Sequence, residues 1–143
     1  MTVWLSDYDV ARMTARVPHP YNEGDAEDFV AAGAPNRFVI ERKRDGLFLG
    51  MAGLHVDEDC EFGYWLGKPF WGQGYATEAT TAALGWAREG WGRRLVVSGH
   101  FADNPASGRV LEKAGFLYTG VVQPRHSKAR GEDAPTRMMV WLA

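Results

Sequence analysis

Alternating hydrophobic and polar positions predict three strands in the first half of the chain. The first two strands flank an Asp45-Gly46 pair, which favours a hairpin because a two-residue type I′ turn needs positive φ at both central residues. In the third strand Phe62, Tyr64 and Leu66 point to one face. The expected strands are Arg37–Arg44, Leu47–Val56 and Cys60–Leu66.

Helical periodicity is clearest from Gly74 to Glu89, where apolar side chains recur at three- and four-residue intervals. A second helix, Pro105–Ala114, is marked by the cap residue Asn104 and by Gly115 just beyond its end. The other expected elements are helices at Val3–Met13 and Gly24–Ala32 and strands at Arg94–Phe101, Leu117–Gln123 and Arg137–Leu142, with a long loop at Pro124–Thr136.

This order of elements, α-α-β-β-β-α-β-α-β-β, predicts an α/β (α+β) fold with a mixed sheet and helices packed on it. The 143 residues fit a single domain spanning residues 1–143. Hydrophobic residues make up 45% of the chain, which is sufficient for one core and gives no compositional sign of disorder.

Charge and cysteine content narrow the classes of function. The formal net charge of −2 and a pI of about 6.1 argue against a nucleic-acid partner. Cys60 is the only cysteine, so an internal disulfide and a thiolate-rich metal site are excluded, and no metal is expected. The N-terminal residues lack a signal-peptide pattern, and no apolar run approaches the roughly 20 residues of a membrane helix. We therefore expect a cytoplasmic protein with no membrane contact.

The turn before the long helix carries the strongest sign of chemistry. Gly72 and Gly74 allow a tight turn and keep side chains away from the first N–H groups of the helix. These groups lack helical partners and carry partial positive charge, so they suit a phosphate. A Gly-Gln-Gly sequence alone is more often a simple turn, so its surroundings decide the interpretation.

Those surroundings resemble the GNAT superfamily of N-acetyltransferases. The segment Trp71-Gly72-Gln73-Gly74-Tyr75-Ala76-Thr77-Glu78-Ala79 is similar to the family's [Arg/Gln]-x-x-Gly-x-[Gly/Ala] motif. A second segment, from Asn104-Pro105-Ala106-Ser107 to Gly115-Phe116, resembles the family's Asn-x-x-Ser helix and its closing Gly-Phe. The resemblance covers roughly Ala26 to the C-terminus and is closest to the branch with the ribosomal-protein alanine N-acetyltransferases.

The resemblance implies acetyl-CoA as co-substrate and a primary amine, on a protein N-terminus or a small molecule, as acceptor. The pyrophosphate is expected on backbone amides of the first motif. Pantetheine is expected between the third strand and the strand that ends near Phe101. The cofactor-binding residues predicted in this way are Trp65, Leu66, Gly67, Gly72, Gln73, Gly74, Tyr75, Ala76, Thr77, Asn104 and Ser107.

The resemblance also implies a mostly antiparallel GNAT-like central sheet flanked by helices. The family's usual first strand is missing from the predicted elements. An open sheet edge favours unwanted pairing, so association with a second copy, as a homodimer, is one hypothetical remedy.

Glu61 is the best candidate for the general base, because it lies on the strand that leads to the predicted reaction centre, on the face shared with Trp65. A solvated glutamate on a strand face is the alternative. His55 and His100, near strand ends, remain further candidates for the base.

Ser107 is the candidate acid that protonates the leaving thiolate, as in this branch of the family. Many family members use a tyrosine at the position of Leu111, which has no proton to give. The alternative for Ser107 is a hydroxyl that satisfies backbone N–H groups at a helix start, and Tyr118 is a weaker candidate acid. Two departures from the family pattern, Leu111 in place of tyrosine and Trp71 in place of Arg or Gln, leave open an alternative function. In that alternative the chain is a catalytically silent acyl-CoA-binding or regulatory domain.

Overall fold

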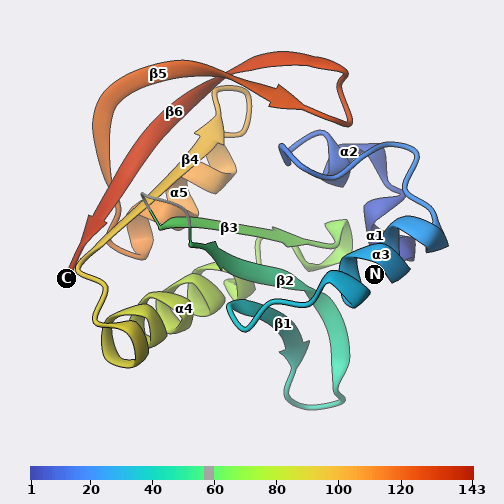
Figure 1. Cartoon of the computed structure of the whole chain (residues 1–143), viewed down its shortest axis with the longest axis horizontal. Coiled ribbons are helices and arrows are strands. Elements are labelled where there is room, and N and C mark those ends of the chain that lie inside the picture. Colours follow the sequence, from blue (N-terminus) through green and yellow to red (C-terminus); the bar gives the residue numbers. More distant parts are fainter. Residues whose placement is uncertain (57–59) are drawn as a thin grey trace.

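The computed structural model of the chain describes residues 1–56 and 60–143 (Figure 1). Six strands form one sheet in the order β1-β2-β3-β4-β6-β5. The elements are α1 (Thr2–Leu5), α2 (Tyr8–Ala11), α3 (Glu23–Ala32), β1 (Arg37–Arg42), β2 (Leu47–His55), β3 (Glu61–Leu66), the 3-10 helix η1 (Lys68–Phe70), α4 (Tyr75–Trp91), β4 (Leu95–Phe101), α5 (Pro105–Lys113), β5 (Leu117–Ser127) and β6 (Glu132–Leu142).

Helices flank the sheet, and each helix covers the side chains that point to its face, because successive side chains of a strand point to opposite faces. Phe62 and Leu66 of β3 point into the main core, where they are buried with side chains of α4 and α5. Trp65, between them in sequence, points to the other face and packs on a smaller cluster formed by Leu5, Val10 and Tyr21. The predicted mixed, mostly antiparallel sheet flanked by helices is therefore confirmed.

The sheet opens between β3 and β4, the only parallel neighbours among the strands of the described residues. These strands pair at a single position, Glu61 with Val97, whereas every other pair of neighbouring strands is antiparallel. The Ser98 hydroxyl still donates to the Phe62 carbonyl, at 3.0 Å. Beyond that point no pairing between β3 and β4 is recorded in the described residues. The gap that results lies where the family resemblance leads us to expect pantetheine.

The N-terminal region differs from the single helix predicted over Val3–Met13. It forms two short helices, α1 and α2, because the Asp7 carboxylate accepts a hydrogen bond from the N–H of Asp9 (2.9 Å) and begins a new helix. The second predicted helix is confirmed as α3. Its start is fixed by a capping box between Asn22 and Asp25.

The hairpin between β1 and β2 is confirmed, but the predicted two-residue type I′ turn is wrong. The strands end at Arg42 and resume at Leu47, so four residues form the loop. Gly46 has φ of 68°, and Asp45 is not in the positive-φ region. The Asp45 carboxylate instead accepts from the Arg42 side chain (2.9 Å) and from the N–H of Leu47 (3.3 Å).

The long loop predicted over residues 124–136 is also wrong. β5 and β6 continue through it as an antiparallel hairpin that turns at residues 128–131 (Figure 1). Most side chains of β5 are exposed, so the segment has no hydrophobic alternation to mark it as a strand. The tip lies against the N-terminal segment, where Ser127 Oγ donates to the Thr14 carbonyl (3.0 Å) and Lys128 N–H to that of Ala15 (3.0 Å).

β1 forms one edge of the sheet, and the described residues contain no strand before it. Leu54 N–H donates to the Asn36 carbonyl, so Asn36 directs its backbone hydrogen-bonding groups toward β2. In an antiparallel pair these groups point toward and away from the neighbouring strand in alternate residues, so those of Val39 and Glu41 point away from β2. This edge is therefore open.

In the described part of the chain, no helix has the length and apolar character needed to cross a membrane.

Candidate active site

A cleft of about 320 Å³ lies between β3, the N-terminus of α4 and the first turns of α5. It collects most of the predicted cofactor residues, although they come from three separate segments of the chain. Those that line it are Trp65, Leu66, Gly72, Gly74, Tyr75, Ala76, Thr77, Asn104 and Ser107. We refer to this cavity as the cofactor cleft.

The N-terminus of α4 presents free backbone donors to the cofactor cleft. Gly72 and Gly74 have φ of 71° and 89°, conformations that side chains disfavour. Gly74 is the N-cap, and no side chain caps this helix. The first helical hydrogen bond runs from Glu78 N–H to the Gly74 carbonyl. The preceding N–H groups therefore remain available to an anion, with the positive end of the helix dipole behind them.

Two cations on α5 add to this anion site. Arg109 and Lys113 line the cofactor cleft across from the start of α4. Lys113 was not among the predicted site residues, although its spacing of four residues from Arg109 on a helix places both on one face. Positive side chains are therefore present even though Trp71 occupies the position where Arg or Gln is common in the family.

Gly67 and Gln73, also predicted to bind the cofactor, do not line this cleft. The N–H of Gly67 donates to the Leu49 carbonyl of β2 (2.8 Å), and the Gln73 amide donates to the Pro69 carbonyl (2.8 Å). Trp71 does line the cleft, and its indole N–H donates to the Leu66 carbonyl (2.9 Å).

A second cavity, of about 230 Å³, lies along β3 and contains Glu61. We call it the acceptor pocket. Glu61 forms an ion pair with Arg125 of β5, and Arg16 Nη2 lies 3.9 Å from its other carboxylate oxygen. His55 lines the same pocket and contacts Arg16 through Nδ1 at 2.7 Å. Sequence reasoning missed both arginines, because they come from segments far from the motifs.

The two cavities meet at Ser107. Its backbone N–H donates to Asn104 Oδ1 (3.3 Å), so the side chain of Asn104 caps α5. The Ser107 hydroxyl accepts a hydrogen bond from the Tyr64 hydroxyl at 3.1 Å. Among the described residues, no backbone N–H donates to this hydroxyl.

The remaining candidates separate into two groups. His100 is buried, lines the acceptor pocket, and contacts the Phe101 carbonyl through Nδ1 (2.8 Å) and Tyr118 Oη through Nε2 (3.0 Å). Tyr118 lines neither the cofactor cleft nor the acceptor pocket. Leu111 is fully buried in the core, so a side chain at this position faces the interior and not either cavity.

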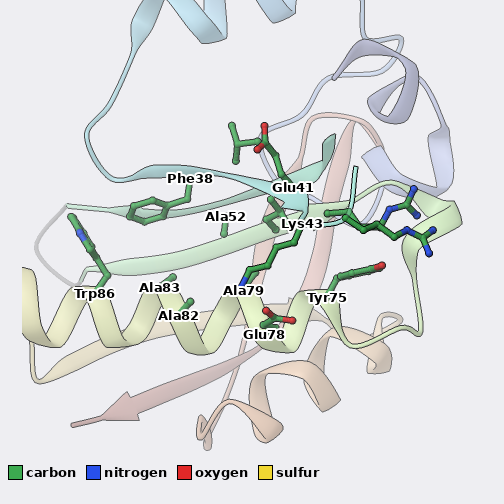
Figure 2. A pocket seen from close by; sticks show the side chains of 14 residues that line it. Phe38, Glu41, Lys43, Ala52, Tyr75, Glu78, Ala79, Ala82, Ala83 and Trp86 are labelled. Carbon is green, nitrogen blue, oxygen red and sulfur yellow. The ribbon is translucent and has the colours of Figure 1, made fainter. Parts of the chain in front are cut away.

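A third cavity, of about 550 Å³, is an apolar groove between the open edge of β1 and one flank of α4 (Figure 2). Phe38 and Trp86, whose ring centroids lie 5.0 Å apart, contribute to it, and Ala79, Ala82 and Ala83 line the helix side. None of the residues predicted as catalytic lies in this groove. The groove is therefore separate from the acceptor pocket and from the junction at Ser107.

Among the described residues, no group of three or more His, Cys, Asp or Glu side chains is placed to hold a metal ion.

Comparison with known families agrees with this geometry. The profile of the acetyltransferase (GNAT) domain matches residues 1–117, so the chain belongs to the GNAT acetyltransferases. Its sequence is similar to the uncharacterized N-acetyltransferase YoaA of Bacillus subtilis, with 30% identity over 91 residues that cover 61% of this chain and 51% of YoaA. A ribosomal N-acetyltransferase-like protein of the same organism, YdaF, is 35% identical over 80 residues, covering 53% of this chain and 44% of YdaF. The chain spans about half the length of the curated relatives it matches.

Solved structures show the same fold. A GNAT-family acetyltransferase from Bacillus anthracis aligns with a TM-score of 0.85 and 20% identity, covering 99% of this chain and 86% of that protein. Spermidine N-acetyltransferase from Vibrio cholerae, in complex with CoA and spermine, aligns with a TM-score of 0.77 and 17% identity, with the same coverage. At such identities the likeness establishes the fold alone.

Proposed function

We propose that this protein transfers the acetyl group of acetyl-CoA to a primary amine by direct attack in a ternary complex. One observation carries the proposal: an anion-binding cofactor cleft and a separate pocket containing a carboxylate meet at a serine hydroxyl. Thioester and amine can then approach each other from the two cavities. Positioning of this kind lowers a barrier without demanding further chemistry from the protein.

In the proposed reaction, the amine nitrogen forms a bond to the acetyl carbon and the carbon–sulfur bond breaks. Glu61, directly or through one water, takes the proton that the nitrogen loses. Ser107 gives its proton to the sulfur and regains one from solvent. The N-terminus of α4, with Arg109 and Lys113, holds the pyrophosphate end of acetyl-CoA.

The ion pair between Glu61 and Arg125 favours a second candidate, a catalytically silent domain that binds acyl-CoA. An arginine paired with this carboxylate stands between it and an incoming amine. Thiol release from acetyl-CoA, measured across a panel of polyamines, amino acids and peptides, separates the two functions. Mass spectrometry of the acceptor must show one added acetyl group. CoA binding without product on any amine would support the silent domain.

We also propose that the open edge of β1 pairs with a second copy of the chain. In antiparallel pairing centred on Val39, which is 53% exposed, Arg37 would lie opposite the partner's Glu41. Moving the centre by one residue towards Ile40 would instead place Arg37 opposite a lysine, Lys43, so charge favours the first register.

A cytoplasmic location remains our proposal, supported by Cys60, which is buried and has a free thiol.

A further inference from the structure

Tyr64 lies where the cofactor cleft and the acceptor pocket join. Five residues line both cavities: Met13, Thr14, Tyr64, Trp65 and Ser107. Two of these five, Tyr64 and Ser107, are joined by a hydrogen bond of 3.1 Å, although they lie 43 residues apart in the sequence. The bond therefore links β3 to α5 across the gap in the sheet.

The direction of this bond determines what the Ser107 hydroxyl can do. A serine hydroxyl has one hydrogen to donate and can accept through its lone pairs. Of the two hydroxyls, the phenol of Tyr64 is the more acidic and therefore the better donor, so the Ser107 oxygen acts as acceptor and keeps its own hydrogen. No other hydrogen bond to this oxygen is recorded among the described residues. The hydrogen is then free to point into the cavity junction.

The surroundings of Tyr64 keep it in the donating form. Burial raises the pKa of the Tyr64 phenol to about 12. The ring stacks on Phe62, with centroids 6.0 Å apart and planes 27° from parallel, and it packs against the main core. Tyr64 therefore remains protonated and fixed in place throughout the neutral pH range.

We propose that Tyr64 is a positioning residue for Ser107: by donating to the serine oxygen, it directs the serine hydrogen toward the departing sulfur of CoA. This inference rests on the proposed acetyltransferase function. Tyr64 itself exchanges no proton in the reaction. It restricts the rotation of one hydroxyl, so that the hydrogen bond to the developing thiolate is already oriented when the carbon–sulfur bond breaks.

A kinetic double-mutant cycle tests the proposal with acetyl-CoA and the amine that the wild-type protein acetylates fastest. We expect Tyr64→Phe to lower kcat by about 10-fold, as for loss of one orienting hydrogen bond, with the KM for acetyl-CoA within about twofold of wild type. In a Ser107→Ala background the same change should have no further effect. Tyr21→Phe is the matched control and should leave kcat unchanged, because it removes another buried tyrosine hydroxyl, one that contacts Met1 and lines neither the cofactor cleft nor the acceptor pocket.

Losses that multiply in the double variant would overturn the proposal, because Tyr64 would then act independently of Ser107. A loss confined to KM or to thermal stability would overturn it too. If Tyr64→Phe does not fold, Ser107→Thr tests the contact from the other side. It keeps the accepting hydroxyl and should retain at least about a tenth of wild-type kcat, whereas equality with Ser107→Ala would refute the role. If the wild-type protein acetylates no amine, the proposed function itself fails, and the role of Tyr64 falls with it.

Discussion

Glu61 and Arg125, which lie 64 residues apart in the sequence, form an ion pair inside the acceptor pocket. The pair connects the start of β3 to the β5–β6 hairpin. Both side chains remain partly exposed, at 23% for Glu61 and 29% for Arg125. An incoming amine can therefore reach the carboxylate if Arg125 moves aside.

Replacing each partner distinguishes a base from a structural ion pair. We expect Glu61→Gln to lower kcat by about 100-fold, the lower range for loss of a general base, while CoA affinity stays unchanged. Arg125→Gln, measured in the same assay, should retain at least about a tenth of wild-type kcat because the carboxylate remains. Equal losses in both variants, accompanied by equal losses of thermal stability, would show that the pair only holds the hairpin.

The start of α4 allows a test of cofactor binding. Gly74→Asp places a negative charge beside the free N–H groups that are proposed to hold the pyrophosphate. Gly74→Ala imposes the same positive-φ strain, at φ of 89°, without the charge. By calorimetric titration we expect CoA to bind at least about 10-fold more weakly to Gly74→Asp than to Gly74→Ala, a difference of about 1.4 kcal/mol. Equal affinities in the two folded variants would contradict the assignment.

Leu111 tests whether the tyrosine found in other family members can be restored. Because Leu111 is fully buried, Leu111→Tyr would overpack the core and would not deliver a hydroxyl to the cavity junction. We expect it to lower the free energy of unfolding by about 1–3 kcal/mol, measured by urea denaturation, and not to raise kcat. A stable variant with a higher kcat would show that this position does face the thioester.

The helix starts that border the cofactor cleft could be predicted from the motifs, because local backbone geometry creates them. Gly72, Gly74 and Asn104 have local structural roles that can be read from sequence, and each takes the expected place at a helix start. The contacts that complete the site come from long-range packing. Neither the bond between Tyr64 and Ser107 nor the approach of Arg125 to Glu61 leaves a local pattern.

The β5–β6 hairpin escaped prediction for a related physical reason. Most of β5 is exposed on both faces. Polar residues are therefore tolerated throughout the strand, and its hydrophobic and polar positions do not alternate. Two basic residues of this hairpin are bonded to carboxylates: Arg130 to Asp103 and His126 to Asp133. Tertiary packing brings Asp103 to Arg130, and β pairing places Asp133 beside His126. The intrinsic secondary-structure propensity of single residues encodes neither contact.

Asp103 makes stability depend on pH in the acid range. Its hydrogen bond from Arg130, at 2.8 Å, lowers the pKa of the carboxyl below its usual value. A lowered folded-state pKa stabilises the protein above the unfolded-state pKa of about 3.9, and this stabilisation is lost as the pH falls through the folded-state value.

We therefore expect Asp103→Asn to cost about 1 kcal/mol or less at pH 7, since the carboxylate is half exposed. The difference from wild type, measured by urea denaturation as a function of pH, should shrink below pH about 4. A difference that stays constant into strong acid would mean that the charge of Asp103 is not what stabilises the contact. Asp28→Asn, at an exposed site on α3, is the control.

The proposed pairing of β1 edges is tested by charge reversal. Glu41→Arg would place like charges opposite each other twice in the dimer, so we expect it to shift the solution mass from dimer to monomer. Mixing Glu41→Arg with Arg37→Glu should restore a heterodimer, because each arginine then meets a glutamate. A wild-type protein that is strictly monomeric at all accessible concentrations would contradict the pairing.

The central claim is direct transfer from acetyl-CoA to an amine within one ternary complex. Initial velocities measured while both substrates are varied test it most directly. Direct transfer predicts double-reciprocal lines that intersect, with the intact mass of the protein unchanged during turnover. Parallel lines together with an acetylated form of the protein, or no turnover on any amine despite bound CoA, would contradict the account.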